Sequence, residues 1–301
     1  MTSMRNLKRV GAAAMALGLG LSLAACGSDD GDGGGSDGGE TITLGIIPSW
    51  TDGLSMAYLW QAVLEDEGYT VEIEEVSEAA PLYTGVARGD VDVYPSAWPE
   101  VTHANYMEEY GDDLEVLGTY YDNAKLTMAV PEYSELNSIE DLVGKADQYD
   151  GKIIGIEPGA GLTDITQNTV MPEYGLDEEY ELVTSSTTAM LAELQKATDN
   201  EEDIVVTLWR PFWANTAFPV KDLEDPKGAL GEPEGLAEVA TAGFSDDFPD
   251  VADMMANAKL DDEQYGSLED MVVNEYGEGK EAEAVEAWLE ENQDWVDSLK
   301  G

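Results

Sequence analysis

Three tryptophans occupy comparable positions in the sequence. Trp50, Trp98 and Trp209 each lie just beyond the end of a short apolar run of strand length. Ligands of open α/β sheets bind in the crevice outside the carboxyl ends of the strands, so these rings could face one site. Tryptophan faces attract cations by about 0.5–2 kcal/mol each, and a box of three would suit a quaternary ammonium. Core packing is the alternative, and it explains three further tryptophans on the apolar stripes of expected helices: Trp60, Trp288 and Trp295.

Two other features could bind an anion beside such a box. His103, the only histidine, lies in the loop that follows Trp98. A glycine turn at residues 159–161 follows an expected strand and precedes a helical stretch at 163–170. Such turns offer free backbone N–H groups and the positive end of a helix dipole to an anion. A lone loop histidine is more often a surface residue and a Gly-x-Gly is weak evidence, but with the aromatic box they would describe a site for a zwitterion.

The composition excludes several other classes of function. The 301 residues contain 14 Lys plus Arg against 64 Asp plus Glu, for a formal net charge of −50. This charge repels phosphate backbones, so no nucleic-acid partner is expected. One cysteine cannot form an internal disulfide and one histidine cannot build a multi-histidine metal centre, so neither a metal nor another cofactor is expected. Since no nucleophile constellation is present either, the sequence favours a binding protein over an enzyme.

The segments that must position these residues alternate between strands and helices. Apolar runs or strict alternation predict strands at 41–47, 71–76, 91–94, 126–130, 152–156 and 204–208. Apolar residues at helical spacing predict helices at 54–67, 81–88, 187–197 and 281–299. Gly68 and Gly89 are expected to end the first two helices, and Ser185 or Ser186 to cap the third. The alternation predicts an α/β fold with mainly parallel sheets.

The first 39 residues are typical of targeting rather than of a folded domain. Residues 1–25 have a basic start, a short apolar middle and a small-residue end, which predict a secretory signal peptide. The end, Leu23-Ala-Ala-Cys26, resembles the lipobox of bacterial lipoproteins. That resemblance implies that Cys26 takes a lipid and anchors the protein to the outer face of the cell membrane; a free secreted cysteine is the alternative. Residues 26–39 continue as a Gly/Ser/Asp tether that cannot bury a core, or as a merely disordered terminus.

Six short motifs follow one another between Thr41 and Gly266. They are Ala57-Tyr-Leu-Trp60, Leu64-Glu-Asp-Glu-Gly-Tyr69, Ala97-Trp-Pro-Glu-Val-Thr-His103, Tyr121-Asp-Asn-Ala-Lys125, Gly155-Ile-Glu-Pro-Gly-Ala-Gly161 and Val205-Val-Thr-Leu-Trp-Arg-Pro211. In this order they resemble the glycine-betaine-binding proteins of ABC importers, the family with the quaternary-amine receptor domain.

The resemblance implies a role for each candidate site residue. Three tryptophans of the family form a cage around the trimethylammonium group, and the matching positions are Trp50, Trp98 and Trp209. The ligand carboxylate is held by a histidine, which matches His103, and by two backbone amides, which align with Gly161 and Leu162. The chain departs from the family at Phe212, where many members have a histidine, so the rim of the site and its ligand preference could differ. Trp213 has no expected role.

The resemblance also implies a fold and a mechanism. The family has the two-lobed type II periplasmic-binding-protein fold, an α/β fold with a hinge of two crossing segments. We expect lobe one at residues 40–122 plus 221–301 and lobe two at 123–220, with crossings near 121–125 and 217–223. Closure of the lobes would complete the site, and the permease would recognise the closed form while its ATPase supplies energy. The family's usual form is a monomer.

Other functions remain compatible with the sequence. The same fold could bind choline, carnitine, proline betaine or ectoine instead of glycine betaine. A lipid-anchored hydrolase with paired carboxylates is a second alternative, because 64 acidic residues guarantee that some pair lies close together. A purely structural or adhesive lipoprotein would leave the strand-end tryptophans without a use.

Overall fold

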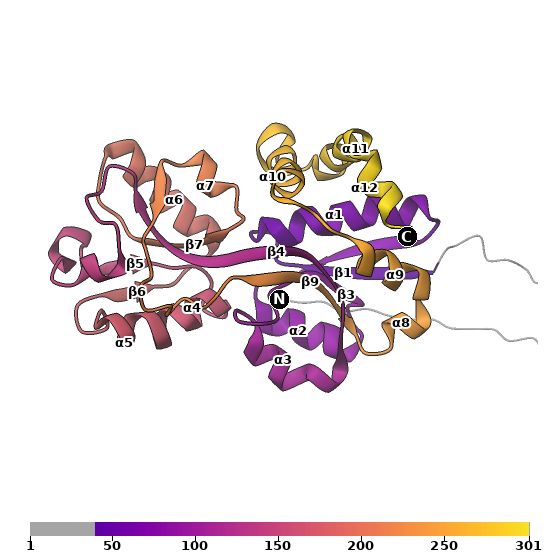
Figure 1. Cartoon of the computed structure of the whole chain (residues 1–301), viewed down its shortest axis with the longest axis horizontal. Coiled ribbons are helices and arrows are strands. Elements are labelled where there is room, and N and C mark those ends of the chain that lie inside the picture. Colours follow the sequence, from indigo (N-terminus) through magenta and orange to yellow (C-terminus); the bar gives the residue numbers. More distant parts are fainter. Residues whose placement is uncertain (1–39, 301) are drawn as a thin grey trace, which may run out of the picture. The chain divides into compact units, whose positions relative to one another are not determined.

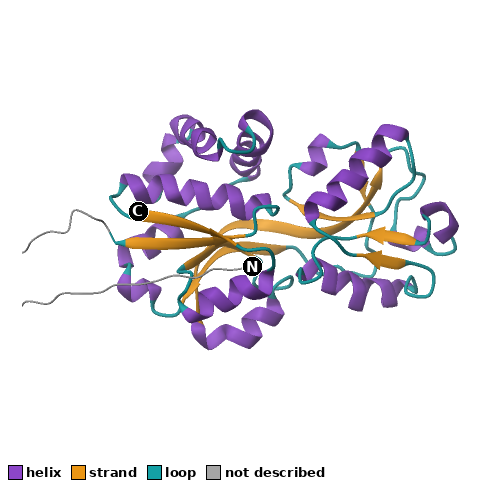
Figure 2. Ribbon diagram, turned by 180° about the vertical axis from the view of Figure 1, so that it is seen from behind, coloured by secondary structure: helices purple, strands orange, loops and turns teal. Residues whose placement is uncertain are grey.

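The computed structural model describes residues 40–300 (Figure 1). The signal peptide predicted at 1–25 and the lipidated Cys26 with its tether, predicted at 26–39, lie outside the described residues. Within residues 40–300, nine strands form a mixed sheet in the order β2-β1-β3-β9-β4-β7-β5-β6, with β8 paired to β4. Helices flank both faces of this sheet (Figure 2).

One half of the sheet is built from the N-terminal strands and a late return strand. Strands β1 (Thr41–Ile46), β2 (Thr70–Glu75) and β3 (Val93–Ala97) are parallel, and β9 (Glu234–Thr241) runs antiparallel to β3. We call residues 40–124 and 234–300 the first half. Its helices are α1 (Thr51–Asp66), α2 (Ala79–Arg88), α3 (Ala104–Tyr110), α8 (Phe244–Asp247), α9 (Pro249–Asn257), α10 (Asp262–Asp270), α11 (Glu281–Glu291) and α12 (Gln293–Ser298), with the short helical turns η1 (Gly111–Asp113) and η5 (Met271–Tyr276).

The second half, residues 125–222, repeats the plan on a smaller scale. Strands β5 (Lys152–Ile154), β6 (Glu181–Val183) and β7 (Val206–Arg210) are parallel to one another. Its helices are α4 (Gly161–Ile165), α5 (Met171–Tyr174), α6 (Thr187–Asn200) and α7 (Ala214–Ala217), with the short turns η2 (Ile139–Leu142), η3 (Ala146–Tyr149) and η4 (Thr166–Val170). Because η4 joins α4 to α5 directly, residues 161–174 form one continuous helical segment.

Two segments pass between the halves. The long strand β4 (Leu114–Pro131) pairs with β9 up to Ala124 and with β7 from Lys125 onward, and it crosses the centre of Figure 1. The chain returns between β8 (Val220–Asp222) and β9. The crossing expected near 217–223 overlaps β8, which pairs with residues 129–131 of β4.

Several other predictions need correction. The sheet is mixed rather than mainly parallel, because β4 and β9 run antiparallel to their neighbours. The expected tail helix is interrupted at Asn292, whose backbone (φ −116°, ψ 40°) is not helical, so it divides into α11 and α12. Gly89 caps α2 with φ +72°, as predicted. Of the two serines predicted to cap α6, Ser186 does so, because its side chain accepts a hydrogen bond from Ala189 N (3.2 Å); α6 itself continues to Asn200.

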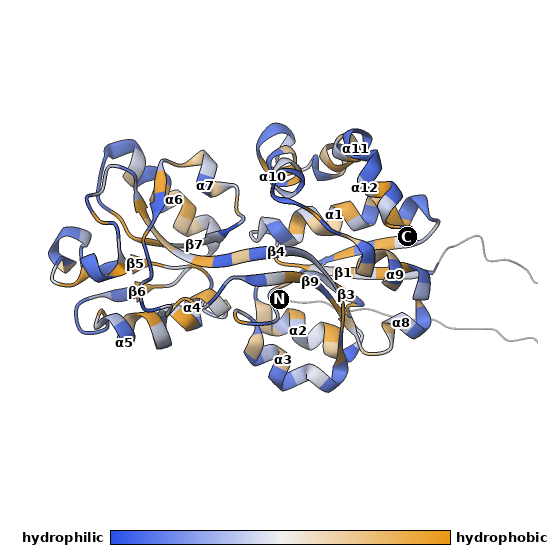
Figure 3. Cartoon of the chain, viewed as in Figure 1, coloured by the Kyte–Doolittle hydropathy of each residue, from blue (hydrophilic) through white to orange (hydrophobic). Residues whose placement is uncertain are grey.

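The core contains the tryptophans that lie on helix stripes. Trp60 and Trp288 have no exposed surface, and Trp295 packs its ring against both, with centroids 6.4 and 5.5 Å away. Figure 3 shows hydrophobic residues along the strands and hydrophilic ones on the outer turns of the helices. The core interpretation of these three residues is confirmed.

Candidate functional site

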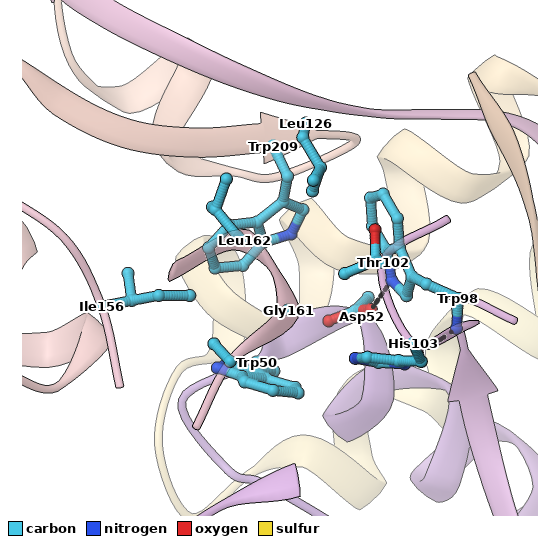
Figure 4. A pocket seen from close by; sticks show the side chains of 11 residues that line it. Trp50, Asp52, Trp98, Thr102, His103, Leu126, Ile156, Gly161, Leu162 and Trp209 are labelled. Atoms are coloured by element: carbon cyan, nitrogen blue, oxygen red, sulfur yellow. Dashed lines mark hydrogen bonds between the residues drawn. The ribbon is translucent and has the colours of Figure 1, made fainter. Parts of the chain in front are cut away.

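One pocket collects every residue that the sequence analysis assigned to ligand binding. Trp50, Trp98 and His103 come from the first half, whereas Gly161, Leu162 and Trp209 come from the second (Figure 4). The empty space between them is about 340 Å³, which includes space open to solvent. Five further residues complete the lining: Asp52, Thr102, Leu126, Ile156 and Ala160.

Trp98 is oriented by a carboxylate of its own half. It directly follows β3, and its indole Nε1 donates a hydrogen bond to Asp52 Oδ2 (3.0 Å), which also accepts one from Ser96 Oγ (2.8 Å). Asp52 lies in the first turn of α1 and is only 2% exposed. Burial raises the pKa of Asp52, and the hydrogen bonds from Trp98 and Ser96 oppose this rise. The Trp98 ring is therefore fixed before any ligand arrives.

Trp50 faces the same pocket but is oriented from the other half. It is the residue before α1, and its Nε1 donates to Glu157 Oε2 across the seam between the halves (3.1 Å). Its ring lies nearly parallel to that of His103, with a centroid separation of 6.0 Å and an interplanar angle of 15°. Trp50 and His103 thus present adjoining flat rings on one wall of the pocket (Figure 4).

His103 is held as a neutral ring with a defined proton position. Its Nδ1 accepts a hydrogen bond from the backbone N–H of Trp98 (3.1 Å), so the ring proton resides on Nε2. Burial lowers the pKa of His103 to about 3, which keeps the imidazole neutral near pH 7. The Nε2–H group is therefore available as a donor to an anion.

A buried glutamate fixes the loop that carries His103. Glu234, at the start of β9, accepts backbone hydrogen bonds from Glu100, Val101 and Thr102 and a further one from Thr102 Oγ1, at 2.5–3.0 Å. Burial raises the pKa of Glu234, and these hydrogen bonds oppose the rise. The loop between Trp98 and His103 therefore has little freedom to move.

The glycine turn supplies backbone donors from the second half. Gly161 and Leu162 are the first residues of α4, and within residues 40–300 neither backbone N–H has a hydrogen-bond partner. A Cβ at Gly161 would lie 1.9 Å from the carbonyl oxygen of Thr102 in the first half, so only glycine fits this approach. Two unpaired N–H groups at a helix start are suited to an anion.

Trp209 forms the wall opposite Trp50. It is the fourth residue of β7 rather than the residue after the strand, as the sequence analysis expected, and its register partner in β4 is Leu126. Phe212 stacks on the Trp209 ring, with centroids 4.0 Å apart and an interplanar angle of 20°. Phe212 thus backs the Trp209 ring, and Trp213 packs in turn against Phe212 and Phe218.

Another buried acid lies where α1 meets the second half. Glu269 of α10 accepts a hydrogen bond from Thr51 Oγ1 and one from the backbone of Trp213. Burial raises the pKa of Glu269 to about 8; the hydrogen bonds oppose this shift and the nearby Asp52 adds to it. Burial therefore favours the protonated form of Glu269.

The functional residues that sequence reasoning missed are mostly acids. Asp52, Glu157, Glu234 and Glu269 each orient part of the site, but single acids among 64 carry no signal of their own. Asp52 could have been found from its place in the first turn of a helix that follows a strand. Among the described residues, no cluster of three or more His, Cys, Asp or Glu could hold a metal ion. In residues 40–300, no helix is both long and apolar enough for a membrane span.

Comparisons with known proteins agree with this geometry. Residues 40–291 match the family model described as the substrate binding domain of ABC-type glycine betaine transport systems. The chain is 34% identical over 161 residues to a glycine betaine/carnitine transport binding protein, GbuC, of Listeria monocytogenes. That alignment covers 51% of this chain and 52% of the relative, so it spans about half the length of each.

Solved structures extend the similarity to the whole described region. The glycine betaine, L-proline-binding protein ProX of Borrelia burgdorferi is 30% identical with a TM-score of 0.81, and the match covers 87% of this chain and 97% of that one. Lactococcal OpuAC, in its closed form with glycine betaine, is 27% identical with a TM-score of 0.80 over 87% of this chain and 100% of that one. The predicted type II periplasmic-binding-protein fold is confirmed.

The family match assigns the general class of the protein. Substrate-binding proteins of ABC importers act outside the cytoplasm and are not enzymes, which agrees with the expectation from the sequence. The family model covers most of the chain, including every residue that lines the pocket. The chain therefore belongs to the family of substrate-binding domains of ABC-type glycine betaine transport systems.

Proposed function

We propose that this protein binds glycine betaine, or a closely related quaternary-ammonium zwitterion, and delivers it to an ABC importer. The observation that carries the proposal is a single pocket in which three indoles lie beside a neutral imidazole and two unpaired backbone N–H groups. Such a pocket offers aromatic faces to a cation and hydrogen-bond donors to an anion. Its proposed ligand carries both groups a short distance apart.

The cation would lie among Trp50, Trp98 and Trp209. A quaternary ammonium has no N–H group to donate to a hydrogen bond. Its binding energy therefore comes from contact with aromatic faces. The three rings are 5–7% exposed, so the cation would be largely removed from water, where cation–π attraction is stronger. The Asp52 carboxyl at the edge of the pocket adds negative potential to the same region.

The carboxylate would accept hydrogen bonds from His103 Nε2 and from the N–H groups of Gly161 and Leu162. Hydrogen bonds to a charged group contribute about 1.5–3 kcal/mol each. Three such bonds would distinguish glycine betaine from choline, which has the same cation but no carboxylate. The donors come from both halves, so the clamp is complete only when the halves meet.

Closure would then couple binding to recognition by the importer. We infer that the two halves act as lobes, with bounds close to those expected at residues 40–122 plus 221–301 and at 123–220 but with β8 in the second lobe, and that they move about the two segments that join them. A ligand that contacts both lobes stabilises the closed form through its higher affinity for that form. In this account the permease recognises the closed form and its ATPase supplies the energy.

The N-terminal sequence supports a proposal for where in the cell the protein acts. We propose that Cys26 carries the lipid, that residues 26–39 tether the domain, and that the protein works as a monomer on the outer face of the cell membrane. Replacement of Cys26 by serine should release the protein into the culture medium, detected by immunoblot of cell and medium fractions. Full retention of the Cys26→Ser protein on cells would contradict the anchor.

A competition assay with fragments of the ligand tests the binding proposal. Labelled glycine betaine should be displaced by the unlabelled compound, but far less by tetramethylammonium, which lacks the carboxylate, or by glycine, which lacks the methyl groups. Carnitine, proline betaine, choline and ectoine belong in the same series as the alternative ligands. Equal displacement by tetramethylammonium would mean that the donors of the pocket do not contribute.

A further inference from the structure

The side chain of Glu157 lies in the seam between the two halves and contacts both. From the first half it accepts hydrogen bonds from Ser49 Oγ and Trp50 Nε1, both at 3.1 Å. From its own half it accepts hydrogen bonds from the backbone N–H and the Oγ1 of Thr187, both at 2.9 Å. Glu157 is 6% exposed, so four donors surround a buried carboxyl group.

The Thr187 bonds hold Glu157 in place whether or not the halves are together. Thr187 is the first residue of α6, a helix of 14 residues, so its N–H belongs to the positive end of the helix dipole. The backbone carbonyl of Glu157 also accepts hydrogen bonds from Ala160 N (3.1 Å) and Thr163 Oγ1 (2.8 Å). The acceptor therefore belongs to the same rigid turn that presents Gly161 and Leu162.

The bonds to Ser49 and Trp50 have a different character. Both donors lie between β1 and α1 of the first half, so these bonds exist only while the halves meet. Within residues 40–300, Trp50 Nε1 has no other acceptor. The orientation of this indole therefore depends on the opposite half, whereas the Trp98 indole is held by Asp52 of its own half.

We propose that Glu157 is a positioning residue that acts as a latch: it fixes the indole of Trp50 only in the closed form and thereby slows ligand release. This inference rests on the proposed function, because it assigns the ligand cage to Trp50. Glu157 does not touch the pocket interior, so its effect is transmitted through the Trp50 ring. The halves then close and the Trp50 ring is fixed in the cage in the same step.

The substitution Glu157→Gln tests the latch with little change in shape. An amide has one oxygen, so its NH₂ group must face either the Trp50 and Thr187 Oγ1 donors or the Ser49 and Thr187 N donors. We expect the Kd for glycine betaine to rise about 10-fold, mainly through faster dissociation in stopped-flow tryptophan fluorescence. Glu78→Gln is the matched control, because Glu78 borders the same seam, its carboxylate has no hydrogen-bond partner among the described residues, and the substitution removes the same charge. Its Kd should stay within about 2-fold of the wild-type value.

Two further variants separate a latch from a merely structural role. Thr187→Val removes a bond within the second half and should leave dissociation nearly unchanged, whereas a structural role of Glu157 would make it resemble Glu157→Gln. Trp50→Phe keeps an aromatic face without the N–H, so Glu157→Gln should have a smaller effect in that background. Full additivity of the two changes, or a normal dissociation rate in Glu157→Gln, would overturn the latch.

A ligand-independent readout keeps the latch testable if the ligand is not a quaternary amine. Dye pairs at Val116→Cys and Val143→Cys, two exposed residues in opposite halves, would report lobe separation in a Cys26→Ser background. Glu157→Gln should lower the closed fraction of the ligand-free protein relative to Glu78→Gln. Failure of the wild type to bind any quaternary amine would refute the proposed ligand, and an unchanged closed fraction would refute the latch.

Discussion

Trp98 and Trp50 face the same pocket, and each donates its indole N–H to a buried carboxyl group. Asp52 holds Trp98 from within the first half at 3.0 Å, whereas Glu157 holds Trp50 from the second half at 3.1 Å. One wall of the cage is thus set by the fold of a single half, and the other is completed by contact between halves. The bond between Trp98 and Asp52 therefore helps to shape the site in either state, whereas the bond between Trp50 and Glu157 forms only when the halves meet.

The largest expected effect comes from removing Trp98, the ring that is held by its own half. Trp98→Ala deletes a cage face and leaves Asp52 without its indole donor, so we expect the Kd for glycine betaine to rise about 100-fold or more. Calorimetric titration would measure the change, with thermal unfolding as the control for folding. An unchanged Kd in a folded variant would remove Trp98 from the cage.

A second large effect should come from blocking closure without touching the cage. Gly161→Ala would place a Cβ 1.9 Å from the backbone oxygen of Thr102, which cannot move aside as a flexible side chain can. We expect at least a 10-fold rise in Kd, with thermal stability of the ligand-free protein preserved. Gly159→Ala in the same turn is the matched control, because its Cβ would meet only the end of the Glu78 side chain at 3.3 Å. Equal losses in the two variants would contradict closure as the cause.

A smaller and more selective effect is expected from the carboxylate clamp. His103→Phe keeps a buried aromatic ring but removes the Nε2 donor, so glycine betaine should bind about 10-fold more weakly. Any binding of choline, which has no carboxylate, should change much less. A uniform loss for both ligands would indicate that His103 only supports the neighbouring rings.

The smallest expected effect concerns pH and the buried carboxyl group of Glu269. Because burial raises the pKa of Glu269 to about 8, its contribution to stability is present at low pH and is lost as the pH rises toward 8. Between pH 7 and 8, where His103 is mostly neutral in both the folded and unfolded states, the wild-type melting temperature should fall by about 2–4 °C. Differential scanning calorimetry of Glu269→Gln should show a flatter dependence, and an equal slope would assign the effect to other buried acids.

The aromatic parts of the site could be predicted because they stand out in the sequence. Trp50, Trp98 and Trp209 are rare residues near the ends of apolar runs. Trp50 and Trp98 follow the parallel strands β1 and β3, which end at one edge of the sheet, whereas Trp209 lies in β7 of the other half and joins them only where the halves meet. Glu157 could not be predicted as a partner of Trp50, since the two are brought together only by contact between the halves. The three tryptophans of the proposed cage can thus be found from the sequence, whereas the hydrogen bonds that orient them depend on tertiary structure.

In the fold, too, features that depend on neighbouring residues could be predicted, whereas features that depend on distant residues could not. The helix end at Gly89 and the cap at Ser186 depend on neighbouring residues, and the sequence analysis placed both. Strand β4 was recognised only at its apolar end, because residues 114–125 contain Gly, Asp and Asn and are held in the sheet by pairing with β9. Its antiparallel course, like that of β9, depends on partners more than 100 residues away along the chain.

Titration calorimetry of the purified protein with glycine betaine, choline and carnitine tests the central claim most directly. We predict tight binding of glycine betaine and at least 10-fold weaker binding of choline, because only the former satisfies His103, Gly161 and Leu162 while its cation occupies the cage. Preference for choline would retain the tryptophan cage but contradict the carboxylate clamp. No heat with any of the three would contradict the assignment of this pocket to quaternary amines.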